Sequence, residues 1–193
     1  MVRRTRISAP ALLWAALLIL LLPLRWLVAA AIAAAFHELC HMLAVKCCGG
    51  SIADLRIGPK GASMDISMLT RRQELIAALA GPAGSLLLTL TAHVFPTLAV
   101  CALVHGAYNL LPVYPMDGGR ALYCGTALLI GEEWAEKLCT WVARILCAIL
   151  LLCGVFGFLI MKWGILPLIF ASILTITIKQ RKMPCKERDL AVQ

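Results

Sequence analysis

Long apolar segments dominate this chain and limit what it can fold into. Hydrophobic residues make up 62% of the 193 residues and charged residues only 15%, with a mean hydropathy of +0.90. A helix needs about 20 mostly apolar residues to cross a bilayer. Six segments approach that requirement: residues 8–22, 26–45, 74–93, 97–111, 136–160 and 163–178. We predict an all-α polytopic membrane protein with about six transmembrane helices, in a single domain that covers residues 1–193.

The basic residues predict how these helices are oriented. With six spans, nearly all Lys and Arg residues of the loops and termini fall on one side, and only Arg25 and Lys162 fall on the other. Because positive charge collects in cytoplasmic loops, both termini are predicted to be cytoplasmic. The net charge of +8 is explained by this bias, so no nucleic-acid partner is expected. Residues 1–22 have the composition of a signal peptide, but the apolar sequence resumes after Arg25, which favours a retained first helix.

The second apolar segment contains the sequence His37-Glu38-Leu39-Cys40-His41. On an α-helix, residues four apart share a face, so His37 and His41 can bind one zinc ion while Glu38 lies beside them as a general base. Such a pair can also be a polar patch. Ionisable side chains are costly in a membrane, however, and those that occur there are usually functional. We therefore predict a zinc site with one ion per chain.

A catalytic zinc ion usually has three protein ligands, so a third residue is needed. Asp117 is the strongest candidate, because it follows a helix end at Pro112 and precedes Gly118-Gly119, where backbone can come close to a ligand. The second and fourth segments both run towards the cytoplasm, so the three residues should lie at a similar depth. Alternatively, Asp117 is an ordinary turn residue.

Residues 46–72 are more polar than the segments around them. Two short extended runs flank Gly58-Pro59-Lys60-Gly61, which is typical of a small β-hairpin at the membrane surface. The hairpin is either a simple connector or an edge strand that pairs with an extended substrate. The nine cysteines include no C-x-x-C pair and lie mostly in apolar segments, so they are interpreted as small buried residues rather than a disulfide framework.

Taken together, these motifs resemble the site-2 protease family of intramembrane zinc metalloproteases. The resemblance rests on His37–His41, on Asn109-Leu110-Leu111-Pro112 and on Pro115–Arg120, and extends over residues 36–120. Without a recognisable PDZ or CBS module, the layout is similar to the compact bacterial branch that includes stage IV sporulation protein FB. The resemblance places the catalytic core at about residues 26–120 in a bacterial cell membrane.

The resemblance implies zinc ligands His37, His41 and Asp117, the base Glu38, and a substrate-binding or intermediate-stabilising role for Asn109. Asn109 can alternatively be a helix-end cap. The chain departs from the family at Ser85, where many members have an asparagine, and this departure concerns substrate handling more than zinc. His105 shares a helix face with Asn109, and a packing role is favoured for it over a place in the polar cluster.

The predicted function is intramembrane zinc endopeptidase activity. The substrate would be a membrane-associated protein cut near its cytoplasmic side, with a membrane regulatory partner possible. The competing prediction is a catalytically silent membrane protein that binds a partner through the same fold, although such a module has no need of Glu38. A metal transporter is disfavoured because the acidic residues lie nearly all in loops.

Overall fold

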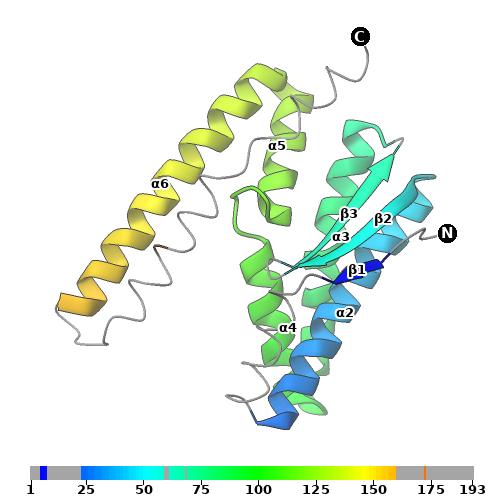
Figure 1. Ribbon diagram of the computed structural model, residues 1–193, viewed down its shortest axis with the longest axis vertical. Helices are drawn as coiled ribbons and strands as arrows, with labels where there is room; N and C mark the ends of the chain where they lie inside the picture. The colour runs from blue at the N-terminus through cyan, green and yellow to red at the C-terminus, as the bar shows by residue number, and fades with distance from the viewer. Residues whose placement is uncertain (1–4, 8–22, 59–60, 68, 160–171, 173–193) are drawn as a thin grey trace. The chain divides into compact units, whose positions relative to one another are not determined.

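The computed structural model describes residues 5–7, 23–58, 61–67, 69–159 and 172 (Figure 1). The predicted first and sixth membrane segments, 8–22 and 163–178, fall almost wholly outside these residues. The chain divides into two compact units, Met1–Leu111 and Pro112–Gln193, and each is considered by itself.

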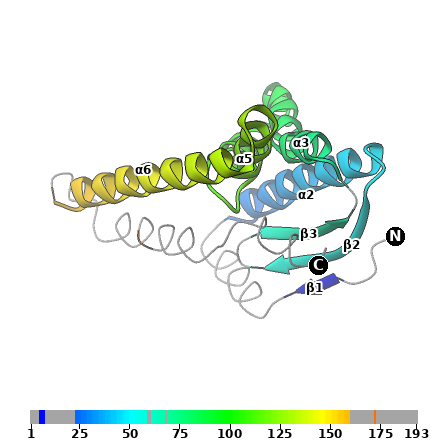
Figure 2. The same ribbon diagram turned by 90° about the horizontal axis from the view of Figure 1, so that it is seen from above.

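Three helices form the helical part of the first unit. α2 spans Leu24–Cys47, α3 spans Arg71–Thr89 and α4 spans Pro96–Asn109, with a short 3-10 turn η1 at Leu90–His93 between the last two. The three helices pack pairwise against one another, and Figures 1 and 2 show α2 and α3 side by side. These helices match the second, third and fourth segments predicted from the sequence, within a few residues at each end.

Small residues let α3 approach its neighbours closely. A Cβ atom added at Gly84 would collide with the side chain of Cys40 on α2, and one added at Gly106 on α4 would lie 2.7 Å from the Cβ of Ser85. Without side chains at these glycines, the helix backbones can pack at short range, as small residues allow in membrane proteins. Pro82 lies inside α3 and is buried together with Gly81 and Gly84.

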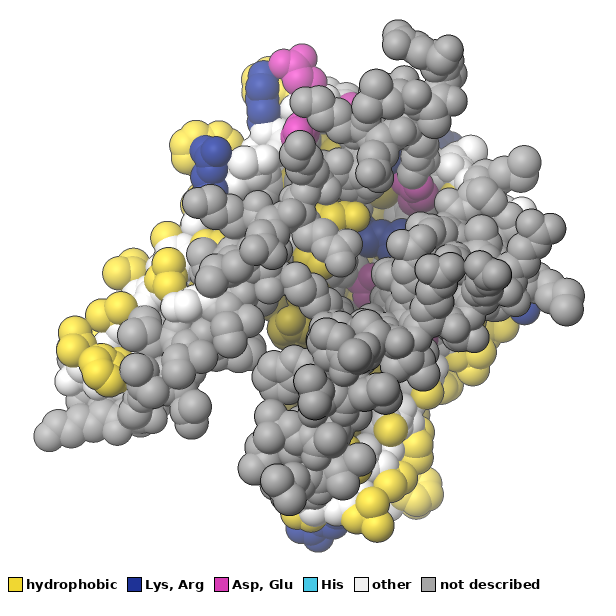
Figure 3. All heavy atoms as spheres, viewed as in Figure 1, with side chains coloured by type: hydrophobic (Ala, Val, Ile, Leu, Met, Phe, Trp, Pro, Cys, Tyr) yellow, Lys and Arg dark blue, Asp and Glu magenta, His cyan; other side chains and the backbone are white. Residues whose placement is uncertain are grey.

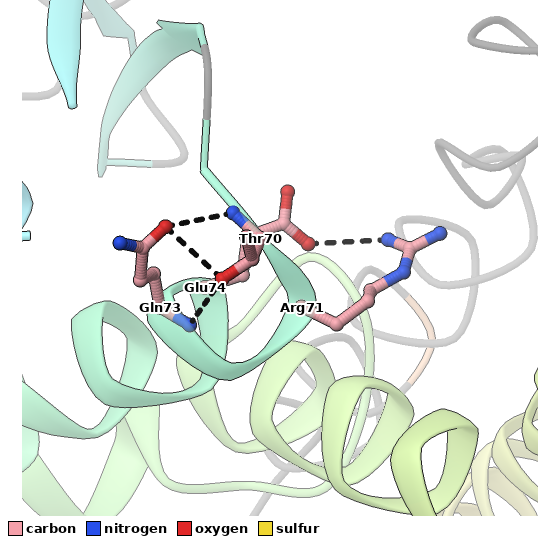
Figure 4. A network of polar contacts seen from close by, with 4 residues as sticks. All are labelled: Thr70, Arg71, Gln73 and Glu74. Carbon is pink, nitrogen blue, oxygen red and sulfur yellow. Dashed lines mark hydrogen bonds and ion pairs between the residues drawn. The ribbon is translucent and has the colours of Figure 1, made fainter.

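A capping box begins α3 (Figure 4). The Thr70 hydroxyl accepts from the Gln73 backbone N–H at 3.4 Å, and the Gln73 side chain accepts from the Thr70 backbone N–H at 2.9 Å. Arg71 and Glu74 form an ion pair at 3.1 Å in the same turn. The Gln73 amide also donates to the Cys48 carbonyl at 2.9 Å, which ties the start of α3 to the end of α2.

Strands lie beside α2 in the first unit (Figure 2). β2 at Ser51–Gly58 and β3 at Gly61–Ser67 pair antiparallel, and β1 at Thr5–Ile7 pairs parallel with β2, giving the order β1-β2-β3. β2 and β3 occupy the stretch for which the sequence predicts a hairpin. Its place at the membrane surface stays a prediction.

The second unit contains two described helices, α5 at Asp117–Ile130 and α6 at Glu132–Leu159, which pack against each other. α6 matches the predicted fifth segment. α5 was not expected, because its first turn contains two glycines, which weaken a helix by about 1 kcal/mol each relative to alanine. In Figure 3 the described side chains along α6 are mostly hydrophobic, and charged ones gather at the end where it begins.

Three of the described helical stretches are long and apolar enough to cross a membrane: Leu24–Cys47, Arg71–His93 and Glu132–Leu159. The chain is accordingly a membrane protein. α4 has 14 residues, which at 1.5 Å per residue is shorter than the roughly 30 Å hydrocarbon core. A full count of six spans therefore stays a prediction.

Candidate metal centre

The two histidines of the predicted motif lie on the buried face of α2. His37 is 1% exposed and His41 is 7% exposed, in a buried stripe at four-residue spacing. The stripe consists of Ala29, Ala33, His37, His41 and Val45. The sequence folds in this way because small and polar residues recur every four positions, whereas the leucines and isoleucines of α2 fall on the other faces.

Each imidazole is held at its Nδ1 atom by α3. The Nδ1 of His41 lies 2.7 Å from the carbonyl oxygen of Ala77, and the Nδ1 of His37 lies 2.8 Å from the hydroxyl of Ser85. A carbonyl can only accept, so His41 carries its ring proton on Nδ1 and presents a lone pair at Nε2. Metal-binding histidines commonly have such a partner on the second nitrogen.

The remaining ring nitrogens face each other. Nε2 of His37 and Nε2 of His41 are 3.1 Å apart, with the two rings edge to face and their centroids 4.7 Å apart. Neutral imidazole nitrogens of this kind are suitable ligands for zinc and other transition metals. The arrangement therefore places two potential metal ligands on one helix, at the spacing that the motif predicts.

Gly81 leaves room for this arrangement. It lies midway along α3 between Ala77 and Ser85, and a Cβ atom added there would collide with the Nε2 atoms of both histidines. α2 and α3 run in opposite directions here, so residues 77, 81 and 85 on one face of α3 lie alongside the two histidines of α2. A glycine is required at residue 81 because the imidazoles lie close to the α3 backbone there.

Glu38 follows His37 on α2 and is partly buried. His105 on α4 packs its ring edge to face against His37, with centroids 4.7 Å apart. The packing role favoured for His105 agrees with this contact, although the sequence did not indicate that the contact is with His37. Asn109 is the last residue of α4, and its amide donates to the carbonyl of His105 at 3.0 Å. A role for Asn109 towards substrate stays a prediction.

Asp117 belongs to the second unit, where it is the first residue of α5 and is buried. The preceding turn is closed by a bond from the Met116 N–H to the Val113 carbonyl at 2.9 Å. Gly119 allows that turn to lie against the helix start, since a Cβ there would collide with the backbone at Val113 and Tyr114. Asp117 thus begins a helix, which the sequence analysis did not predict.

Comparisons with known proteins bear on this geometry. The chain is 28% identical over 155 residues to a zinc metalloprotease of Methanocaldococcus jannaschii, an alignment that covers 73% of this chain and 43% of that protein. The structure of this chain matches that of the site-2 protease from the same organism with a TM-score of 0.68 and 21% sequence identity. The match covers 93% of this chain and 91% of the other. The chain has the site-2 protease fold. No protein-family model matches it.

The resemblance to site-2 proteases found in the sequence is confirmed by these matches. The likeness to the branch that includes stage IV sporulation protein FB stays a prediction. The chain spans less than half the length of the curated relative that it matches. Sequence reasoning identified His37 and His41 correctly as a facing pair but missed Ser85 as the partner of His37.

Proposed function

We propose that this chain is an intramembrane zinc metalloendopeptidase that uses His37, His41 and Asp117 as zinc ligands. The observation that carries the proposal is the facing pair of histidine Nε2 atoms, each ring fixed at Nδ1 by α3, within a site-2 protease fold. The similarity to a zinc metalloprotease supports the same activity.

The donor set fits zinc. Two imidazoles and one carboxylate match in chemical type the two-histidine, one-carboxylate sets of catalytic zinc enzymes. Three protein ligands leave a coordination position for water. A bound zinc ion would supply a Lewis acid and lower the pKa of that water towards neutrality.

The protein groups proposed to act on substrate are Glu38 and Asn109. Glu38, next to His37 on α2, would accept a proton from the attacking water and deliver it to the leaving amine as the peptide bond breaks. Asn109, at the end of α4, would donate a hydrogen bond to the substrate carbonyl as charge develops on its oxygen. Each group must reach the scissile peptide for this role.

The proposed substrate is a membrane-associated protein, cut near the cytoplasmic side. A helical substrate hides its carbonyls in its own hydrogen bonds, so it must become extended before attack. β3 has β2 as its one partner strand within the described sheet, so its other edge could pair with an extended substrate. The alternative function, a silent partner-binding protein, would use the same fold without hydrolysis.

The first experiment measures zinc per chain in detergent-purified protein. We expect about one zinc in the wild type, none when His37 and His41 are both replaced by alanine, and weakened binding in Asp117→Ala. His93→Ala is the matched control, because His93 is an exposed histidine in η1 of the same unit and its loss should leave zinc unchanged.

The second part of this experiment separates the enzyme from the silent module. Glu38→Gln should retain zinc and fold but lose cleavage of a membrane-protein substrate in liposomes. Folded wild-type protein that takes up no zinc when metal is supplied would rule out the protease and leave the silent module as the better account.

A further inference from the structure

The two candidate zinc ligands on α2 are oriented in different ways. His41 is held by the main-chain carbonyl of Ala77, which is present whatever side chain occupies that position. His37 is held at Nδ1 by the side chain of Ser85, which a substitution can remove. The asymmetry makes the Nδ1 contact of His37 the one that is lost when a side chain on α3 is truncated.

Ser85 is buried as completely as its partner. Ser85 is 0% exposed and His37 is 1% exposed, and the bond between them joins residues 48 positions apart in the chain. Burying a polar side chain removes its hydrogen bonds to water, which costs free energy unless a protein partner replaces them. Ser85 therefore has a specific partner, which the sequence pattern around Pro82 does not reveal.

α4 packs against α3 at Ser85. A Cβ atom added at Gly106 on α4 would lie 2.7 Å from the Ser85 Cβ and 3.4 Å from its hydroxyl oxygen. Gly106 thus leaves the space that the serine fills, with its hydroxyl towards His37. His37, Ser85 and Gly106 form a contact line through α2, α3 and α4, all within the first unit.

The contact with Ser85 is compatible with either neutral tautomer of His37. A hydroxyl can donate or accept, so Nδ1 of His37 can carry the proton or receive one. Only the form with the proton on Nδ1 leaves a lone pair at Nε2 for the metal. In that form Ser85 accepts, and the hydrogen bond makes the imidazole a better ligand.

We propose that Ser85 is a positioning residue that fixes His37 with its proton on Nδ1 and its Nε2 lone pair directed to the zinc ion. This inference rests on the proposed zinc site. It assigns Ser85, which the sequence analysis related to substrate handling, to the metal centre.

The test measures the zinc dissociation constant of the full chain in detergent, by competition with a chromophoric chelator. Ser85→Ala should weaken zinc binding by about 10- to 100-fold, the range for losing a residue that orients a metal ligand. Thr89→Ala is the matched control, since Thr89 is one turn further along α3 and its hydroxyl bonds the Leu86 carbonyl of its own helix. Its zinc affinity should equal that of the wild type.

A cobalt-substituted sample distinguishes positioning from general damage. If Ser85 orients His37, the visible absorption bands of Co²⁺ should shift in folded Ser85→Ala and stay at their wild-type positions in Thr89→Ala. The lost buried hydrogen bond should also lower the thermal unfolding temperature of metal-free Ser85→Ala, but a merely structural role would do so without moving the bands. Wild-type zinc affinity with unchanged cobalt bands in folded Ser85→Ala overturns the inference and leaves the proposed function intact. A wild type that binds no zinc overturns both.

A measurement on the unmodified protein decides the matter if Ser85→Ala does not fold. In zinc-loaded wild type labelled with ¹⁵N-histidine, the His37 ring should show zinc at Nε2 and a hydrogen-bonded proton at Nδ1. Zinc at Nδ1, or an Nδ1 proton that exchanges as fast as that of exposed His93, contradicts the proposal.

Discussion

α2 and α6 are both long enough to cross a membrane, yet they are built differently. The most apolar window of α2 has a hydropathy of 1.7 and is 28% buried, whereas that of α6 has a hydropathy of 2.5 and is 11% buried. The more apolar helix is thus the less buried one. In a chain of this kind, hydrophobicity indicates surface available to lipid, and the protein interior is made by other residues.

The residues that face inward support this interpretation. α2 exposes large aliphatic side chains and buries alanines, valine and the two histidines. The buried residues of α6 are also small: Ala135, Cys139, Gly154 and Gly157. Because lipid is as apolar as leucine, close packing and polar contacts hold such helices together rather than burial of leucine. α2 differs from α6 in having a polar site on its small-residue face.

The strongest test of this difference replaces a glycine at the polar site. Gly81→Ala should weaken zinc binding by more than about 100-fold, beyond the effect of losing a single orienting residue, because the new methyl group collides with both histidines. Overpacking should also destabilise the fold by about 1–3 kcal/mol. The readouts are zinc affinity by chelator competition and thermal unfolding in detergent.

Gly125→Ala provides the matched control in the second unit. Gly125 is also a helical glycine, on α5, but a Cβ there meets nothing within 4 Å. Its replacement should leave zinc binding unchanged and stabilise α5 by about 0.5–1 kcal/mol. Equal effects of the two substitutions would mean that close packing at Gly81 is not what shapes the site.

The sequence predicted the helices better than it predicted their contacts. Apolar length located α2, α3, α4 and α6, and four-residue spacing placed His37 and His41 on one face. α5 was missed because Gly118 and Gly119 have low helix propensity. The close contact of Gly119 with the backbone at Val113 is what requires a glycine at residue 119.

The partners of the bonds that orient the histidines could not be predicted from local sequence patterns. The His37 bond to Ser85 joins residues 48 apart and the His41 bond to Ala77 joins residues 36 apart. No local pattern fixes such a pairing, since it depends on the depth at which α3 packs against α2. A weak indication was available in Gly81, because a glycine inside an apolar helix usually has a packing reason.

The second prediction tests the small-residue face of α2 away from the histidine site. Ala33 is 1% exposed and neighbouring Ile32 is 49% exposed. Ala33→Leu adds volume to a packed interface and should destabilise the protein by about 1–3 kcal/mol. Ile32→Leu keeps the volume on the exposed face and should change stability by less than about 0.5 kcal/mol. Thermal unfolding in detergent measures both.

A stable Ala33→Leu variant would show that α2 can shift without cost, which conflicts with an interior defined by small residues. In that outcome the separation between α2 and α3 would not be set by alanine and glycine, and the fixed Nε2 to Nε2 distance would need another explanation.

The smallest effect concerns polar contacts at the ends of helices. Thr70→Ala removes the capping box of α3 and frees Gln73, whose side chain also bonds the Cys48 carbonyl, so a loss of about 0.5–2 kcal/mol is expected. The comparison is Lys137→Ala in α6, which removes an ion pair to Glu133 at 2.7 Å. Thermal unfolding of both variants at low and high salt is the measurement.

The Thr70–Gln73 contacts and the Lys137–Glu133 ion pair should respond differently to salt. Gln73 also links α3 to α2, whereas the ion pair lies on the exposed surface of α6 alone. Lys137 and Glu133 are 55% and 80% exposed, so solvent and salt screen their attraction and Lys137→Ala should be nearly neutral. The Thr70 loss should persist in high salt, since its capping bonds are made by neutral groups. If Lys137→Ala were the more damaging variant, the start of α6 would be held by its charges, and apolar length alone would no longer account for that helix.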